Sequence, residues 1–211
     1  MNDLISSIAE AKKKGRDKEV VELIEKALKE KIDPKKILNE GCTKGIMEIG
    51  ELFQKNEAFI PDMLIASRAM KKGVELLKPF LQADSVNALG KIVVGTVKGD
   101  LHDIGKNLVG IMYQSIGFEV IDLGIDVNTE KFMDAIKKSG AKMVSLSALL
   151  TTTMAHQIET LKEIKSVFGD SVKVLVGGAP VTQEWADSIG ADGYARDSYG
   201  AAILAKRIAS M

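Results

Sequence analysis

One short segment of the chain combines residue types that could hold a metal ion. In Gly99–Gly105, Asp100 stands two residues before His102, so its carboxylate can accept a hydrogen bond from one nitrogen of the imidazole ring. A histidine held in this way presents its second nitrogen to a metal. A lone histidine is more often structural or catalytic than metal-binding, so the neighbouring segments must decide its role.

The segment lies between a strand-like run and a helical pattern. Residues 91–97 are apolar and rich in β-branched side chains, which predicts a buried strand, and residues 105–115 have helical spacing. This alternation of strand-like and helical patterns predicts an α/β domain at 90–211 with a doubly wound parallel sheet, Rossmann-like and more specifically flavodoxin-like. The later strand-like runs are 118–123, 143–149, 172–176 and 192–195, and the later helical patterns are 129–139, 152–167, 181–189 and 198–210.

Loops that follow the strands of such a sheet gather along one rim, where ligands bind. After the third strand comes the hydroxyl-rich stretch Ser145–Thr153, in which one threonine is expected to cap the next helix. After the fourth strand comes Gly177–Gly178, and after the fifth comes Tyr194–Ser198. With His102 on the same rim, these loops could cradle a large flat ligand whose centre the histidine binds.

Residues 3–83 have apolar side chains at helical spacing and no strand-like alternation. Breaks at Gly15–Asp17, at Asp33–Pro34 and at Lys55–Ala58 divide this part into four helices, the third running from about residue 34 to residue 54. Because the connections are short, the pattern favours a four-helix bundle over 1–85. The polar stretch 83–90 is the expected linker to the second domain.

The composition excludes several classes of function. The 29 Lys and Arg residues balance the 29 Asp and Glu residues, so no overall field favours nucleic acid or an anionic membrane. The single cysteine, Cys42, excludes an intramolecular disulfide and a multi-cysteine metal site. No apolar run is long enough to span a bilayer, and the first residues do not form a leader pattern. We expect a cytoplasmic protein that binds neither nucleic acid nor membrane.

Two nucleotide-binding patterns do not fit the sequence. Five residues separate Gly99 from Gly105, where a phosphate loop needs four, and Asn107 stands where a magnesium-binding hydroxyl belongs. The dinucleotide fingerprint is also absent from this loop, although Asp122 and Asp126 lie at the distance of a ribose-binding acid. We therefore expect these two aspartates to be polar residues at a strand end.

Three motifs in a fixed order resemble one family. They are D-x-H-x-x-G at Asp100–Gly105, S-x-L at Ser147–Leu149 and G-G at Gly177–Gly178. In the helical half, Gly50–Phe53 and Phe59–Pro61 are also similar to that family. The chain, from about residue 5 onward, resembles the cobalamin-binding corrinoid proteins of methanol, methylamine and O-demethylase methyltransferase systems, and the cobalamin module of methionine synthase.

The resemblance implies a role for each residue of the motifs. His102 would be the lower ligand of cobalt, in place of the cofactor's own dimethylbenzimidazole, which inserts into the sheet domain. Asp100 and Thr153 would form a hydrogen-bond relay that tunes this ligand, with threonine where methionine synthase has serine. The expected cofactor contacts on the sheet domain are Leu101, Asp103, Ile104, Gly105, Ser147, Leu149, Thr151, Gly177, Gly178 and Tyr194. Phe53 and Ile60 would shield the upper, methyl-bearing face.

By the same resemblance the chain would be a non-catalytic methyl carrier. Its cofactor would alternate between cob(I)alamin and methylcobalamin, taking a methyl group from a substrate-specific methyltransferase. A second methyltransferase would transfer the group to tetrahydrofolate or a similar acceptor. A reductive activase would return oxidised cobalt to the cob(I)alamin form. The alternatives are the small subunit of an adenosylcobalamin-dependent mutase, a cobalamin sensor, and a cofactor-free flavodoxin-like interaction domain.

Overall fold

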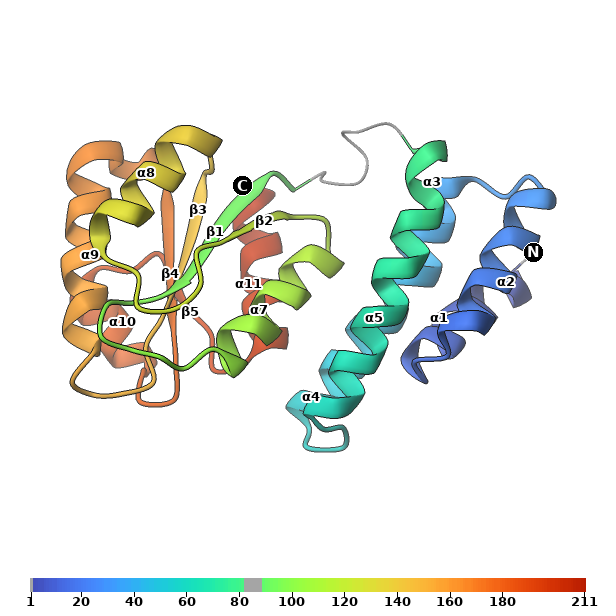
Figure 1. Ribbon diagram of the computed structural model, residues 1–211, viewed down its shortest axis with the longest axis horizontal. Helices are drawn as coiled ribbons and strands as arrows, with labels where there is room; N and C mark the ends of the chain where they lie inside the picture. The colour runs from blue at the N-terminus through green and yellow to red at the C-terminus, as the bar shows by residue number, and fades with distance from the viewer. Residues whose placement is uncertain (1, 82–88) are drawn as a thin grey trace. The chain divides into compact units, whose positions relative to one another are not determined.

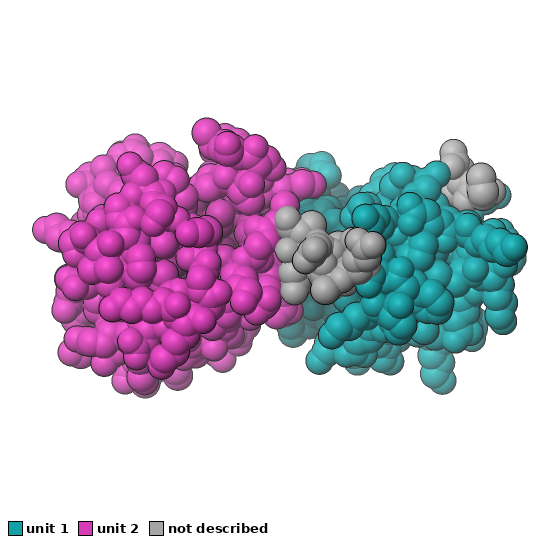
Figure 2. Space-filling view, turned by 90° about the horizontal axis from the view of Figure 1, so that it is seen from above, with its two compact units in different colours: residues 1–88, 115–117 teal, residues 89–114, 118–211 magenta. Residues whose placement is uncertain are grey.

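The computed structural model describes residues 2–81 and 89–211, and the chain divides into two compact units (Figure 2). One unit is built from the N-terminal helices, and the other from a sheet with its flanking helices. The expected linker at 83–90 lies almost entirely outside the described residues.

The second unit contains a five-stranded parallel sheet in the order β2-β1-β3-β4-β5. This is the strand order of the flavodoxin-like fold, so the predicted fold class is confirmed. The strands are β1 (Lys91–Thr96), β2 (Glu119–Asp122), β3 (Met143–Ser147), β4 (Lys173–Gly177) and β5 (Gly193–Tyr194).

Helices cover both faces of this sheet (Figure 1). The helices α8 (Thr129–Ser139), α9 (Met154–Phe168) and α10 (Gln183–Ile189) lie on one face, and α7 (Ile104–Ser115) and α11 (Ser198–Ala209) lie on the other. The chain therefore leaves the neighbouring strands β1 and β3 toward opposite faces. In open α/β sheets this switch of direction opens the crevice in which ligands bind.

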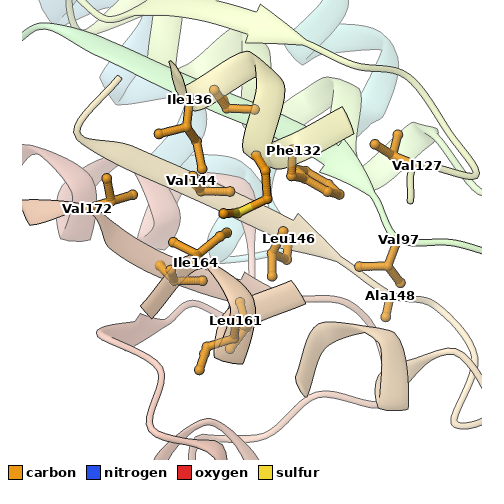
Figure 3. Packing of buried hydrophobic residues seen from close by; sticks show 14 of the residues in the cluster. Val97, Val127, Phe132, Ile136, Val144, Leu146, Ala148, Leu161, Ile164 and Val172 are labelled. Atoms are coloured by element: carbon orange, nitrogen blue, oxygen red, sulfur yellow. The ribbon is translucent and has the colours of Figure 1, made fainter. Parts of the chain in front are cut away.

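Burial on both faces explains the uninterrupted apolar runs of the strands. Val93, Val144 and Val174 lie side by side in register and are all fully buried. Phe132 of α8 and Ile164 of α9 pack on the same face (Figure 3). The sheet is thus a rigid support for the loops at its carboxyl edge.

The first unit contains the four helical stretches expected from the sequence. Asp33 caps the third by accepting a hydrogen bond from the Lys35 amide at 2.9 Å, and Pro34 occupies its first position. None of the helices in the described residues is long and apolar enough to cross a membrane. The bounds are α1 (Asn2–Lys13), α2 (Asp17–Lys29), α3 (Pro34–Lys36), the π-helical η1 (Ile37–Thr43), α4 (Lys44–Gln54), α5 (Ile60–Leu77) and the 3₁₀ turn η2 (Lys78–Phe80).

The π-helical segment η1 is a departure from the uniform helix predicted for 34–54. It buries Cys42, and nearby the fully buried Lys12 of α1 donates a hydrogen bond to Sδ of Met70 on α5. A charged ammonium in this surrounding is poorly solvated. Burial lowers the pKa of Lys12 to about 8, and the neighbouring Cys42 offsets only part of the effect. The helical unit therefore contains a destabilising charge at neutral pH.

We predict that Lys12→Met stabilises the helical unit at pH 7. The fall in pKa from 10.5 to about 8 corresponds to a penalty of up to about 3 kcal/mol, which the thioether does not suffer. Urea unfolding of the full chain, followed by the methyl NMR signal of the buried Met63, measures the change within this unit. The exposed Lys18→Met is the matched control and should change the free energy of unfolding by less than about 0.5 kcal/mol.

The difference in unfolding free energy between Lys12→Met and wild type should also depend on pH. Because the folded-state pKa lies below the unfolded one, the penalty is complete below pH 8 and disappears as the pH rises toward 10.5. The stability gap between Lys12→Met and wild type should therefore narrow over this window. A gap that stayed constant from pH 7 to pH 10.5 would contradict the assignment.

Candidate functional site

The carboxylate of Asp100 is the centre of the hydrogen bonds in the loop between β1 and α7. It is fully buried, and its Oδ1 accepts from both the amide and the ring Nδ1 of His102, at 3.1 and 2.8 Å. Its Oδ2 accepts from the Leu149 amide and from the Thr153 hydroxyl, each at 2.7 Å. The carboxylate thus joins the histidine loop to the loop that follows β3.

These donors determine the charge of the pair. Burial alone would raise the pKa of the Asp100 carboxyl, but the donors from Leu149, Thr153 and His102 outweigh it and hold that pKa well below its usual range. An ionised carboxylate can only accept hydrogen bonds, so Nδ1 of His102 must carry its proton. In the neutral ring the lone pair then lies on Nε2, and half of the side chain is exposed. The arrangement can present Nε2 to a metal.

Thr153 stands at the N-cap position of α9, but its side chain makes no capping bond there. Its hydroxyl instead donates to Asp100 and to the Leu150 carbonyl, the latter at 2.9 Å. The expectation that one threonine of 151–153 caps the helix is therefore wrong for Thr153, because the buried carboxylate takes this hydroxyl. Thr151 is exposed.

The ends of three strands lie in register at the same edge of the sheet. Thr96, Ser147 and Gly177 are direct neighbours across β1, β3 and β4. The next residue, Gly178, has a φ of 133°, and a Cβ there would lie 1.7 Å from the carbonyl oxygen of Ala148. Only glycine fits this close approach of two loops. Tyr194, at the end of β5, is half-buried against the core.

Large apolar side chains are exposed around His102. A soluble protein rarely leaves several such side chains together without a partner or ligand. Asp103 is exposed as well, and a Cβ on Gly105 would meet no protein atom within 4 Å. The exposed apolar residues on the two loops are Leu101, Ile104, Leu149 and Leu150, with exposed fractions of 68%, 61%, 38% and 43%.

Phe53 and Ile60 belong to the helical unit. Phe53 is half-buried near the end of α4, and Ile60, which opens α5, is 38% exposed. The adjacent Phe59 is more exposed, at 67%. Their expected position above a cofactor stays a prediction.

Comparison with known proteins identifies the family. B12 binding domain models match residues 4–78 and 90–203. A corrinoid protein of Desulfitobacterium hafniense is 42% identical over 209 residues, which cover 97% of each chain. Dimethylamine corrinoid protein 3 of Methanosarcina acetivorans is 42% identical over 206 residues, or 97% of this chain and 96% of that one. The chain belongs to the cobalamin-binding corrinoid proteins of methyltransferase systems.

A solved structure supports the same family. A chain in the methanol:cobalamin methyltransferase complex of Methanosarcina barkeri matches 99% of this corrinoid protein and 80% of its own length, with a TM-score of 0.84 and 29% identity. The family predicted from the sequence motifs is therefore confirmed, as is cobalamin as the cofactor.

The residues present fit this cofactor. The half-exposed imidazole has a defined tautomer, and the apolar side chains around it suit a broad, flat macrocycle. In the described part of the chain, the buried hydroxyl of Ser198, at the start of α11, is one of two buried side-chain atoms without a hydrogen-bond partner. A polar group of the cofactor's nucleotide tail would satisfy it.

Two contacts at the carboxyl edge of the sheet could not be predicted from the sequence. Asp122, expected to be a strand-end polar residue, binds the buried ammonium of Lys106 with both oxygens at 2.6 Å. The fully buried Gln157 of α9 donates from Nε2 to the carbonyls of Leu146 and Gly177, each at 3.1 Å. It thereby bridges the ends of β3 and β4. No pattern of neighbouring residues marks either contact.

We predict that Gln157→Met destabilises the sheet unit by about 2 kcal/mol, because the buried carbonyls of Leu146 and Gly177 lose a donor. Urea unfolding followed by the fluorescence of Trp185 measures the effect, since its indole donates to Gln157 at 3.3 Å. Gln114→Met, at an exposed position, is the control and should leave the midpoint unchanged. Equal midpoints for the two variants would refute the bridging role.

Proposed function

We propose that this corrinoid protein carries a methyl group between two methyltransferases, with His102 as the lower cobalt ligand and the dimethylbenzimidazole displaced. The observation that carries the proposal is the bond between Nδ1 of His102 and Asp100, which leaves Nε2 free to coordinate. When bound, cobalamin supplies a cobalt centre that can accept a methyl group from one partner and release it to another.

The residues behind the histidine would control how firmly it coordinates. Asp100 holds the ring in one orientation and makes Nε2 more basic through its negative charge. The hydroxyl of Thr153 donates to the other carboxylate oxygen and so draws charge away from the histidine. In this proposal Asp100 and Thr153 form a relay that sets the balance between a coordinated and a detached histidine.

The strand ends would hold the rest of the cofactor. Ser147 and Thr151 offer hydroxyls to the displaced nucleotide tail, and Gly177 and Gly178 offer a wall without side chains. Tyr194 would close the slot. Apolar and backbone contacts to the macrocycle would come from Leu101, Asp103, Ile104, Gly105 and Leu149.

Relatives indicate which partners to test. They include dimethylamine and trimethylamine corrinoid proteins, and one similar structure comes from a methanol:cobalamin methyltransferase complex. We therefore infer a methylated amine or methanol as the first donor, and tetrahydrofolate or a similar acceptor for the second methyltransferase. Phe53 and Ile60 would shield the methyl group, and a reductive activase would restore oxidised cobalt in the reducing cytoplasm.

The ligand assignment predicts a spectroscopic difference between two histidine variants. After reconstitution with hydroxocobalamin, His102→Ala should lose the visible spectrum of histidine-ligated cobalt, because the proposed coordinating imidazole is removed. His156→Ala is the matched control, since His156 lies on α9 and bonds Glu159 at 3.0 Å. An unchanged spectrum in His102→Ala would contradict the assignment of His102 as the cobalt ligand.

The carrier function predicts transfer of label in two steps. The reduced, cobalamin-loaded protein should acquire ¹⁴C from labelled dimethylamine or methanol only when the matching methyltransferase is present. A second methyltransferase with tetrahydrofolate, or with a thiol acceptor, should then remove the label. His102→Ala should slow the combined turnover at least tenfold. Failure to acquire label from either substrate, together with selective uptake of adenosylcobalamin, would instead favour a mutase subunit.

A further inference from the structure

Asp126, in the loop between β2 and α8, contacts the backbone of the histidine loop at two points. Its Oδ1 accepts from the Gly99 amide at 2.7 Å, although the two residues are 27 apart in the sequence. Its own amide donates to the carbonyl of Asp100 at 3.0 Å. These reciprocal bonds fix the peptide units on both sides of the Gly99–Asp100 link.

Backbone bonds continue this connection to the histidine. The Val127 amide donates to the carbonyl of Thr96 at 3.0 Å, and the Thr96 amide donates to Gly124 at the same distance. The buried Thr96 hydroxyl donates to the carbonyl of His102 at 2.8 Å. The loop after β2 therefore determines where the segment from Gly99 to His102 lies.

The local structure around Asp126 does not explain its backbone conformation. Its φ of 51° is in the left-handed region, which a residue other than glycine adopts at a cost. It does not cap α8, because Asn128 does so by accepting from the Lys131 amide at 3.1 Å. Asp126 is exposed and strained, and its carboxylate bonds the backbone of another loop. We therefore relate its conformation to the position of that loop.

We propose that Asp126 is a positioning residue for the coordinating histidine: it holds the backbone of Gly99 and Asp100 so that the Asp100 carboxylate meets His102. The proposal rests on the proposed function, because it assumes that His102 binds cobalt. Asp126 itself touches neither the ring nor the carboxylate of Asp100. Its effect passes through the backbone of the segment from Gly99 to Asp100.

Two variants separate the carboxylate from the strained backbone. Asp126→Gly removes the side chain and accepts the positive φ without strain. Asp126→Asn keeps an acceptor oxygen and tolerates the same φ, so it should rescue most of the effect. Lys31→Gly is the matched control, since Lys31 has a φ of 59° in the helical unit.

Each protein is measured in two forms. Without cofactor, the ¹⁵N–¹H signal and hydrogen exchange of the Gly99 amide report the anchor directly. With hydroxocobalamin, the visible spectrum at pH 7 reports the ratio of histidine-ligated to histidine-detached cofactor, and filtration reports the total bound. In Asp126→Gly we expect faster Gly99 exchange and a roughly tenfold lower histidine-ligated ratio, with total binding retained. Asp126→Asn should stay near wild type, and Lys31→Gly should equal it.

Three results would overturn the proposal. Unchanged Gly99 exchange in Asp126→Gly would show that the anchor does not exist. Faster exchange with an unchanged histidine-ligated ratio would show that the anchor does not position the ligand. Wild-type protein without any histidine-ligated spectrum would overturn the proposed function, and this inference with it. If Asp126→Gly fails to fold, Asp126→Ala removes the same carboxylate but adds strain at the positive φ, so it is compared with Lys31→Ala, which adds the same kind of strain in the helical unit.

Discussion

The arrangement of the candidate site depends on one buried carboxylate, which accepts hydrogen bonds from residues of two loops. Asp100 accepts from the backbone and ring of His102 on one oxygen and from Leu149 and Thr153 on the other. The β3–α9 loop supplies the donors to Oδ2, and the histidine takes no part in these bonds. The negative charge of Asp100 is therefore also stabilised by groups other than the imidazole. The ring is therefore one of several partners of this anion, which would suit the proposed role of His102 as a ligand that attaches and detaches.

Two of the buried charges in the described residues, Asp100 and Lys12, have opposite consequences. Asp100 is stabilised by donors on both oxygens, so its burial strengthens a defined geometry. Lys12 has only sulfur neighbours among the contacts described for its ammonium, so its burial weakens the helical unit. The sheet unit thus has a precise polar site within a rigid core. The helical unit has a buried charge without such donors among its described contacts.

Patterns of neighbouring residues were enough to predict the sheet but not its connections. Apolar β-branched runs located the strands, yet the run at 143–149 ends as a strand at Ser147, because the Leu149 amide turns to Asp100. The motif at Asp100–Gly105 located the histidine. Asp126 and Gln157 could not be found, since their bonds join residues far apart in the sequence, and the π-helical turn at 37–43 depends on packing against α1.

The distance along the chain between Asp100 and its donors also affects when the site can form. The bonds to Leu149 and Thr153 join residues 49 and 53 positions apart, and α7, β2, α8 and β3 lie between them. Such contacts require closure of a long loop, so they form only after β1 and β3 have paired. During folding the Asp100 carboxyl is at first hydrated and only later enclosed. If His102 binds cobalt as proposed, cofactor loading would follow completion of the central strand pair, and an incompletely folded chain would have no site for cobalt.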